Sequence, residues 1–411
     1  MRLVLMLLAA LPVLGQSLAQ EAEALLPKMI EIRRDLHKNP ELSNREVRTG
    51  KRIAEELTRI GVPFRSGIAS NGLVATIEGK LKGPVVAIRA DTDALPIKET
   101  IDVPYRSINE GVKHACGHDS HVSVALGVTE LLWKRRNSLK GTVLVVFQPA
   151  EEGPPVGEKG GAPLMLEEGI FTKLEPEVMF ALHAMPSVEY GSISWTPGSQ
   201  MASSDRFKIT VRGRGTHGAT PHMGVDPIVA GAQIVSAMQT IASRNIDPLE
   251  PVVVTIGSFH AGTRFNIVPD EAELIGTIRT LNSEVRETTK RRLKEIAERV
   301  AASSGATAVV EFDLGIPVLR NDEKIGAWGE AVLQKELGAT KVIRQPARMI
   351  AEDFAFFADL IPSFYFFLGV GNKEKGITAA LHTAEFDIEE RAMVTGVQAM
   401  SRLVIDYMAE R

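Results

Sequence analysis

Acidic and imidazole side chains stand at the ends of three strands that the sequence predicts. The apolar runs 84–88, 142–147 and 178–182 are typical of strands buried on both faces. Ligands of open α/β sheets bind outside the carboxyl ends of the strands, so we expect the side chains after these runs to meet at one edge of a sheet. These side chains are Asp91 and Asp93 after the first run, Glu151 and Glu152 after the second, and His183 after the third.

A cysteine and a further histidine are expected at the same edge. Cys116 and His118 belong to the segment 114–121, which leads directly into a predicted helix. Acids and imidazoles gathered at one buried edge would repel one another or lack partners, and one or two divalent metal ions would supply the missing positive charge. Carboxylate, imidazole and thiolate ligands together suit zinc, manganese or cobalt better than magnesium or calcium. The adjacent acids Glu151 and Glu152 can divide the work, because one can bind metal while the other acts as the base on a metal-bound water.

Each of these motifs has a simpler interpretation when it is taken alone. An Asp-x-Asp pair after a strand is often only a turn or a helix cap, and a Glu-Glu pair is often solvated surface. Cys116 could be a small buried residue or a catalytic nucleophile, and His183 could be a histidine of the core. Their joint placement favours a metal site. The sequence also lacks the His-Glu-x-x-His, Gly-x-Ser-x-Gly and P-loop motifs of other enzyme classes.

The elements that position these residues alternate between strand and helix. Continuous apolar runs between segments of helical period are typical of an α/β domain with a largely parallel sheet. The predicted strands cover 72–77, 84–88, 142–147 and 178–182; the predicted helices run from Glu21 to the Asn39-Pro40 break, over 46–60 and 122–133, and near 324–337 and 388–408.

A second pattern interrupts this alternation near residue 200. The strand predicted at 206–211 alternates polar and apolar residues, which is typical of a half-exposed antiparallel strand. The elements that follow complete a βαββαβ unit of about 110 residues, the size of a small domain. They are a helix at 227–243, strands at 252–259 and 272–279, a helix at 283–302 and a strand at 308–312. We therefore expect one domain made of 20–200 and 313–411, with a second domain, 201–312, inserted into it.

Composition excludes several classes of protein. The 411-residue chain is 44% hydrophobic and 24% charged, which is ordinary for a globular protein. A formal net charge of −4 and an aromatic content of 5% argue against a nucleic-acid-binding protein, which would usually carry a basic surplus and a base-stacking surface. The single cysteine excludes an intrachain disulfide.

Residues 1–19 have the pattern of a signal peptide. Arg2 precedes an apolar run from Leu3 to Leu14, and a small-x-small triplet follows, so we expect cleavage after Ala19. A membrane anchor and a buried first helix are the alternatives. The run is shorter than the roughly 20 residues of a membrane span, and Pro12 interrupts it. We therefore expect an exported protein, periplasmic or extracellular, with no membrane segment in its mature form.

An ordered set of motifs resembles the two-metal amidohydrolases and carboxypeptidases of the aminoacylase and carboxypeptidase G type. Within these the chain is most similar to the branch of hippurate hydrolases, auxin-conjugate (IAA-amino acid) hydrolases and N-acyl-L-amino-acid amidohydrolases. Each stretch alone is weak evidence, whereas the set in order across the chain is specific. The matching stretches are 37–42 with Glu46, 89–96, 114–119, 148–153, 215–222, 352–354 and 381–383.

The resemblance implies a zinc-peptidase-like catalytic domain, a ferredoxin-like inserted lid domain and two divalent ions per subunit (manganese or zinc, with cobalt or nickel as alternatives). The implied metal ligands are Cys116, His118, Glu152, His183 and His382. Glu151 matches the general base and acid, and Asp93 matches the acid that orients a metal ligand. Cys116 would stand where relatives outside this branch place a bridging carboxylate. Asp91 falls where other branches carry a histidine ligand.

The resemblance also implies roles for three residues of the inserted domain. His217 matches a histidine that polarises the scissile carbonyl and often comes from the partner subunit, which implies a homodimer formed through the inserted domain. Asn266 matches a lid residue near bound substrate. Arg279 is our choice for holding the substrate carboxylate, on bidentate geometry. For all three, an ordinary surface or turn position stays open. Gly218 departs slightly from the family, which usually has alanine there.

The function implied is metal-dependent hydrolysis of the amide bond of N-acyl amino acids, including hippurate-like, N-acetyl and aromatic-acyl conjugates. A metal-bound water would attack, with Glu151 as general base and then acid, and the products would be a carboxylic acid and a free amino acid. A dipeptidase or carboxypeptidase acting on short peptides at the same metal centre is the first alternative. A non-catalytic metal- or peptide-binding protein is the second, and it predicts a missing base or ligand.

Overall fold

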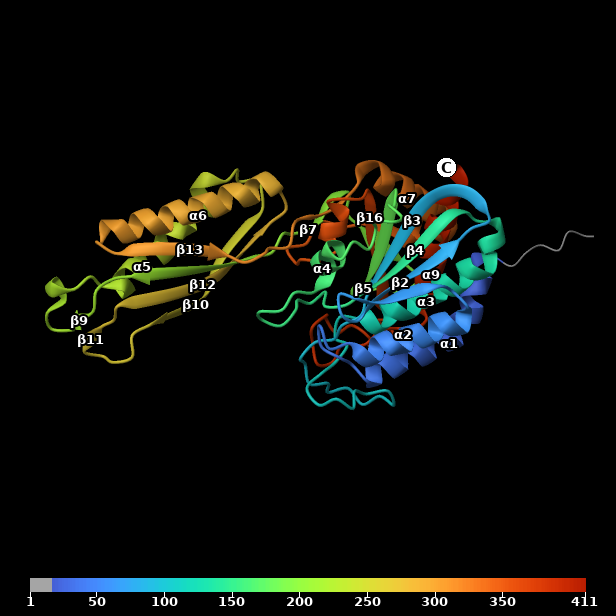
Figure 1. Ribbon diagram of the computed structural model, residues 1–411, viewed down its shortest axis with the longest axis horizontal. Coiled ribbons are helices and arrows are strands. Elements are labelled where there is room, and N and C mark those ends of the chain that lie inside the picture. The colour runs from blue at the N-terminus through green and yellow to red at the C-terminus, as the bar shows by residue number, and fades with distance from the viewer. Residues whose placement is uncertain (1–16) are drawn as a thin grey trace, which may run out of the picture.

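The structure is a computed structural model that describes residues 17–411 (Figure 1). The predicted signal peptide lies outside the described residues except for Ser17 to Ala19. Ser17 caps helix α1 (Leu18–Lys38) by accepting a hydrogen bond from the Gln20 backbone, and Leu18 is only 3% exposed. Cleavage after Ala19 would remove this cap and this packing contact, and the signal peptide stays a prediction. Within residues 17–411, every helix is too short or too polar to cross a lipid bilayer.

An eight-stranded mixed sheet forms the centre of the large domain. Its order is β1-β2-β4-β3-β5-β16-β6-β15, and the adjacent strands β4, β3, β5 and β16 run parallel. This sheet has the mostly parallel arrangement predicted for the α/β class. The strands are β1 (Phe64–Ile68), β2 (Gly72–Glu78), β3 (Leu81–Asp91), β4 (Lys140–Gln148), β5 (Val178–Glu189), β6 (Ile193–Trp195), β15 (Val342–Arg344) and β16 (Ser363–Gly371).

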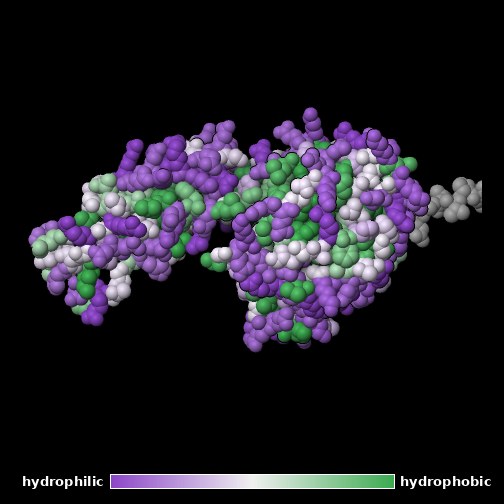
Figure 2. All heavy atoms as spheres, in the orientation of Figure 1, coloured by the Kyte–Doolittle hydropathy of each residue, from purple (hydrophilic) through white to green (hydrophobic). Residues whose placement is uncertain are grey.

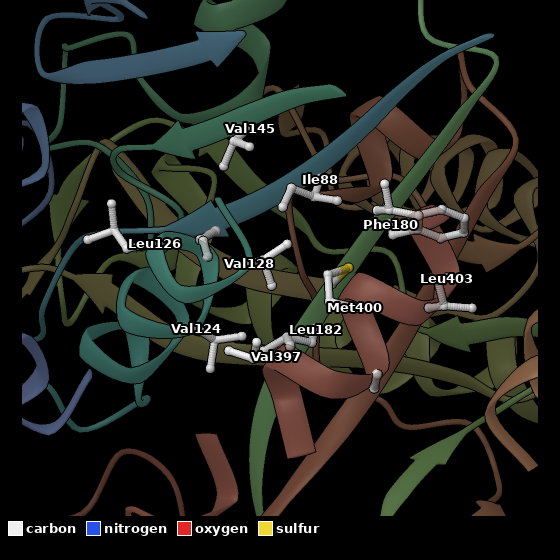
Figure 3. Packing of buried hydrophobic residues seen from close by; sticks show 14 of the residues in the cluster. Ile88, Val124, Leu126, Val128, Val145, Phe180, Leu182, Val397, Met400 and Leu403 are labelled. Atoms are coloured by element: carbon white, nitrogen blue, oxygen red, sulfur yellow. The ribbon is translucent and has the colours of Figure 1, made fainter. Parts of the chain in front are cut away.

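Helices cover both faces of this sheet, which is why its central strands are continuous apolar runs. Figure 3 shows side chains of α3 and α9, among them Val128 and Met400, packed against Ile88 and Phe180 of the strands. The helices of this face are α1, α2 (Val47–Ile60), α3 (His118–Arg135), α7 (Glu323–Leu337) and α9 (Ala392–Glu410). The short helices α4 (Gly161–Glu167) and α8 (Ala355–Ala358) pack on the opposite face.

One central strand was not among the predicted elements. Only helices are predicted after residue 312, yet β16 is buried along its whole length between β5 and β6. The predicted helix at 388–408 also begins later, at Ala392. The strand is hard to predict because a buried strand and a buried helix segment look alike where an apolar run has no alternation to mark its type.

A four-stranded antiparallel sheet forms the inserted domain, in the order β10-β12-β8-β13. It has its own apolar core beneath α5 and α6, and the outer face of α6 is hydrophilic (Figure 2). Its elements are β8 (Asp205–Arg212), α5 (Pro227–Thr240), β10 (Val252–Ala261), β12 (Glu271–Thr280), α6 (Ser283–Ser303) and β13 (Thr307–Phe312). These lie within the range 201–312 expected for this domain.

Short elements complete the fold. A two-stranded ribbon of β9 (Thr216–His217) and β11 (Ile267–Val268) extends from the far end of the inserted domain (Figure 1). Where the chain crosses between the domains, β7 (Gly198–Met201) pairs with β14 (Leu319–Asn321). Single turns of 3₁₀ or π helix occupy 136–138, 221–223, 241–245 and 339–341.

Candidate metal centre and active site

The structure brings the five predicted metal ligands together. They come from the start of α3, from the segment after β4, from β5 and from the loop after β16. Cys116 Sγ lies 3.3 Å from His183 Nε2 and 3.2 Å from His382 Nε2. Glu152 Oε1 lies 3.2 Å from His382 Nε2 and 3.9 Å from His118 Nε2. These side chains therefore line one polar site at the carboxyl ends of the parallel strands.

The ligand atoms form two overlapping groups that share the sulfur of Cys116. One group adds His118 and His183, the other adds Glu152 and His382, and in each all ligand atoms lie within 4.8 Å of one another. His118 Nε2 and Glu152 Oε1 are buried, and neither has a hydrogen-bond partner in the part of the chain that the structure describes. A buried polar atom without a partner is costly, so these atoms indicate a bound cation. The residues fit two divalent ions.

Burial raises the pKa of the Cys116 thiol well above its usual value, and the charges of Glu152 and Glu151 raise it further. A protonated thiol is a poor nucleophile, so this environment disfavours the alternative of nucleophilic catalysis by Cys116. A bound divalent cation would instead lower the pKa of this thiol, because it stabilises the thiolate that coordinates it. The site thus suits Cys116 as a metal ligand.

Gly117 allows the start of α3 to pack closely against β5. Gly117, between Cys116 and His118, has a φ of 88°, in the left-handed region that favours glycine. A Cβ at this position would lie 2.8 Å from the Cβ of Ala184 in β5. The start of α3 can therefore approach the strand that carries His183 closely enough for sulfur and imidazole to meet.

Asp93 fixes the orientation of His118. His118 Nδ1 donates to the Asp93 carbonyl oxygen at 2.8 Å and lies 3.2 Å from Asp93 Oδ1. Asp93 Oδ2 accepts from Ser43 Oγ at 2.7 Å and from the Glu152 backbone at 3.0 Å. Burial alone would raise the pKa of Asp93, but the hydrogen bond from His118 holds it below its usual value. His118 therefore presents Nε2 to the site, and the geometry suits the orienting role expected for Asp93.

His183 and His121 stand side by side and differ in what they can bind. His183 Nδ1 donates to the Ala184 carbonyl at 2.8 Å, which leaves Nε2 free to coordinate. Burial, followed by the charge of His121, lowers the pKa of His183 well below its usual value, so the ring is neutral, as a ligand must be. His121 Nε2 accepts from the Ala184 backbone at 2.7 Å and Nδ1 donates to Asp91 Oδ1 at 2.5 Å. Both nitrogens of His121 are thus occupied, and His121 positions β5.

A buried cluster of charges lies beneath the metal ligands. Arg89 contacts Asp91 at 2.6 Å, Glu352 at 2.8 Å and Asp353 at 3.0 Å. Asp91 is bound to both Arg89 and His121, and its Oδ2 also lies 3.7 Å from His118 Nε2. From the sequence, 352–354 was only a matching stretch, and no role was predicted for Arg89 or His121. Only the contact between β3 and a segment more than 260 residues away reveals this cluster.

Glu151 stands between this cluster and the ligand set. Its Oε2 lies 3.9 Å from His118 Nε2, and its Oε1 accepts from the Asp353 backbone at 3.4 Å. Burial raises the pKa of Glu151 well above its usual value, and the charges of Glu352 and Glu152 add to this effect. A carboxylate whose proton affinity is raised can both take up and return a proton near neutral pH. This position suits the predicted general base.

The family model described as Peptidase family M20/M25/M40 matches residues 87–406, which is more than half of the chain. The chain belongs to this family. Membership confirms the predicted family, the predicted class of fold and the predicted metal-dependent hydrolysis of amide bonds.

Individual relatives in the M20/M25/M40 family cover nearly the whole chain. Thermostable carboxypeptidase 2 of Saccharolobus solfataricus is 37% identical over 396 residues, 96% of this chain and 99% of that protein. N-acetylcysteine deacetylase of Bacillus subtilis is 37% identical over 384 residues, 92% of this chain and 96% of that protein. A solved structure, the Bacillus subtilis YXEP protein, described as a dinuclear metal-binding peptidase, superposes with a TM-score of 0.80 at 34% identity, covering 94% of this chain and 99% of that one. With the ligand groups described above, this likeness confirms the predicted two-ion centre.

The structure does not bring the three predicted residues of the inserted domain to the metal ligands of the same chain. His217 lies in β9, and the Gly218 backbone donates to the Asn266 carbonyl at 2.8 Å, so His217 and Asn266 share the terminal ribbon, away from the large domain (Figure 1). Arg279 lies half-buried in β12, next to Thr280, whose carbonyl accepts from Ser203 at the domain crossing. Arg279 is therefore at the opposite end of the sheet from His217. The roles of all three residues stay predictions.

Proposed function

We propose that the protein hydrolyses the amide bond of N-acyl amino acids and releases a carboxylic acid and a free amino acid. The observation that carries this proposal is the position of Glu151, a buried carboxylate of raised pKa with one oxygen 3.9 Å from His118 Nε2 of the two-ion ligand set. The relative named N-acetylcysteine deacetylase supports an N-acyl amino acid as the substrate class.

Different residues of the chain perform different parts of the proposed reaction. Cys116, His118, Glu152, His183 and His382 would hold two divalent ions, whose Lewis acidity would activate water and stabilise negative charge on the scissile carbonyl oxygen. Glu151 takes a proton from the attacking water and returns it to the leaving amine nitrogen, which expels the amino acid. Asp93 and the Ala184 carbonyl hold the rings of His118 and His183 so that Nε2 of each faces the ions.

The cavity beside Glu151 supports an apolar acyl group. It has a volume of about 700 Å³ and lies between the loop 153–160 and the domain crossing. Val156 of this loop and Leu314 of the crossing are 97% and 79% exposed, and Figure 2 shows a hydrophobic tip where the loop extends toward the inserted domain. Lys159 and Arg206, which also line the cavity, are already paired with Glu167 and Asp313. We infer that this cavity receives the uncharged acyl part of the substrate, and not its carboxylate.

A substrate panel tests the proposed function. The protein, reconstituted with zinc, manganese, cobalt or nickel, is assayed on hippurate, N-acetyl amino acids and dipeptides. Preferential release of amino acids from the acyl substrates supports the proposal. The relative named carboxypeptidase favours the alternative of a peptidase, and preferential cleavage of dipeptides would establish it. Binding of these compounds without any turnover would show a non-catalytic binding protein instead.

We also propose a homodimer formed through the inserted domain. β10 is an outer strand of its sheet, and Ile228 and Val229 on α5 are exposed apolar residues. An unpaired outer strand beside an exposed apolar helix face suits an isologous contact with a second copy. Light scattering of the purified protein should give twice the chain mass, and Val229→Glu should give the chain mass. A wild-type protein that is monomeric at micromolar concentration would refute the dimer.

We further propose that residues 1–19 are removed during export. The charged start, the apolar run and the small-x-small triplet support this proposal. Expression of the full chain followed by fractionation and intact-mass measurement tests it. A mature protein beginning at Gln20 outside the cytoplasm supports export, and a full-length protein retained inside the cell contradicts it.

A further inference from the structure

The residue that precedes the base has an unusual backbone conformation. Ala150, directly before Glu151, has a φ of 56°, in the left-handed region that non-glycine residues rarely adopt. It is buried at the end of β4, where the chain turns from the sheet toward the metal ligands. An L-residue persists in this region only where its surroundings hold it there, and such residues cluster at functional sites.

One side chain far away in the sequence holds this turn. Glu46, which is fully buried at the start of α2, accepts a hydrogen bond from the Ala150 backbone at 2.8 Å through Oε1. Its other oxygen accepts from Asn71 Nδ2 at 3.3 Å. Glu46 gives no side-chain cap to its own helix, so the carboxylate is directed at the turn.

Two further backbone hydrogen bonds hold the segment around Glu151. The Glu152 backbone donates to Asp93 at 3.0 Å, and the Asp353 backbone donates to Glu151 Oε1 at 3.4 Å. Asp93 also orients His118, whereas the carboxylate of Glu46 accepts from Ala150 and Asn71. Glu46 therefore holds the segment 150–152 at Ala150, and Asp93 holds it at Glu152.

We propose that Glu46 is a positioning residue: its carboxylate oxygen holds Ala150 in the left-handed conformation and thereby directs Glu151 toward the metal centre. If the backbone of Ala150 rotated into an ordinary conformation, the carboxylate of Glu151 would move, because the φ and ψ angles of one residue set the direction of the next side chain. The positioning depends on an acceptor oxygen at the distance that the Glu46 side chain reaches, and not on its negative charge. This inference rests on the proposed role of Glu151 as the base.

Two conservative variants separate reach from charge. Glu46→Gln keeps an oxygen at the same reach and removes the charge, and the Asn71 amide can turn to accept from the new amide. Glu46→Asp keeps the charge and withdraws the oxygen by one methylene. We expect Glu46→Gln to retain kcat within about threefold of wild type. We expect Glu46→Asp to lower kcat by roughly 100-fold, the loss typical of a catalytic group displaced by about 1 Å. KM and the content of two ions per chain, measured by elemental analysis, should not change in either.

The chain offers a matched control. Ala69 is also left-handed, with a φ of 46°, and its backbone donates to Glu168, in the segment after α4, at 2.8 Å. Glu168→Asp makes the same shortening at the same kind of turn and should leave kcat unchanged. An equal loss of kcat in Glu46→Asp and Glu168→Asp would show a general effect on folding and would overturn the inference.

The remaining outcomes are also decisive. An active Glu46→Asp with an inactive Glu46→Gln would assign the effect to charge and refute the positioning role. Loss of metal in Glu46→Asp would place its effect on the ligands instead of on Glu151.

If wild type hydrolyses the panel while Glu151→Gln does so equally well, the proposed base fails. If Glu151→Gln is inactive and Glu46→Asp is normal, only this inference fails.

Discussion

Glu151 is the proposed general base, and a single substitution tests that role. Glu151→Gln keeps the size and the hydrogen bond from the Asp353 backbone but cannot carry the transferred proton. We expect kcat to fall by roughly 10²–10⁴-fold, the contribution typical of a general acid–base group. Elemental analysis should still give two ions per chain, since Glu152 and the other ligands are intact. Near-normal kcat with full metal content would remove Glu151 from the mechanism.

A second prediction at the residue scale concerns the charge of Glu46. Burial, and next the charge of Asp93, raise the pKa of Glu46 from 4.5 to about 7. A raised pKa in the folded state means that the folded protein binds this proton more tightly than the unfolded chain does. The resulting stabilisation is fully present below the unfolded pKa and is lost as the pH rises through 7.

The pH dependence of stability should therefore differ between wild type and Glu46→Gln. At pH 8 the wild type carries a buried charge that the variant lacks, so the Tm of the variant should be higher. The difference should shrink as the pH falls toward 5, where Glu46 is protonated. Differential scanning calorimetry of the metal-free proteins measures both curves, with Glu168→Gln as the control for a carboxylate removed elsewhere. A constant difference across this pH range would show that the pKa of Glu46 is not raised by folding.

At the scale of elements, the loop 153–160 and the domain crossing determine the space beside the base. Leu314→Asp places a charge in the cavity of about 700 Å³ without touching the ligands. We expect kcat/KM for an N-benzoyl amino acid to fall about tenfold, in the range typical of a hydrophobic pocket contact, with little change for the N-acetyl form of the same amino acid. Leu249→Asp, at a similarly exposed leucine of the inserted domain, should leave both values unchanged. Equal losses on both substrates would mean that the acyl group binds elsewhere.

Some of the elements that position the site can be predicted from the sequence, and others cannot. The apolar runs that lead into Asp91, Glu151 and His183 are continuous, so periodicity and the rule about strand ends were enough to predict that these side chains gather at one edge. Strand β5 itself continues past His183 to Glu189. His382 was assigned by resemblance alone, because its loop follows β16, which the sequence analysis did not identify. The contacts of Glu46 with Ala150 and of Arg89 with Glu352 join residues 104 and 263 positions apart. No local pattern encodes contacts of this kind, since they follow from the packing of elements that are distant in the chain.

At the scale of the whole molecule, the decisive feature is the distance between the metal ligands and His217, which is predicted to act on substrate. Glu151 and the metal ligands belong to the large domain, while His217 lies on the ribbon at the far end of the inserted domain (Figure 1). If His217 acts on substrate, it therefore reaches the metal centre of a second copy more readily than its own. An isologous dimer contains two such composite sites, because each copy gives its ribbon to the other.

Mixing two inactive variants tests this arrangement. Glu151→Gln and His217→Ala should each be nearly inactive as pure dimers. After dissociation and reassociation of an equal mixture, one site in each mixed dimer combines an intact Glu151 with an intact His217. Random pairing makes half of the dimers mixed, so about one quarter of the wild-type activity should return. Mixing Glu151→Gln with itself is the control for recovery during the procedure. A mixture as inactive as its components would mean that His217 serves its own chain, which would require the inserted domain to fold back over the metal centre. An active His217→Ala would mean that His217 has no part in the reaction.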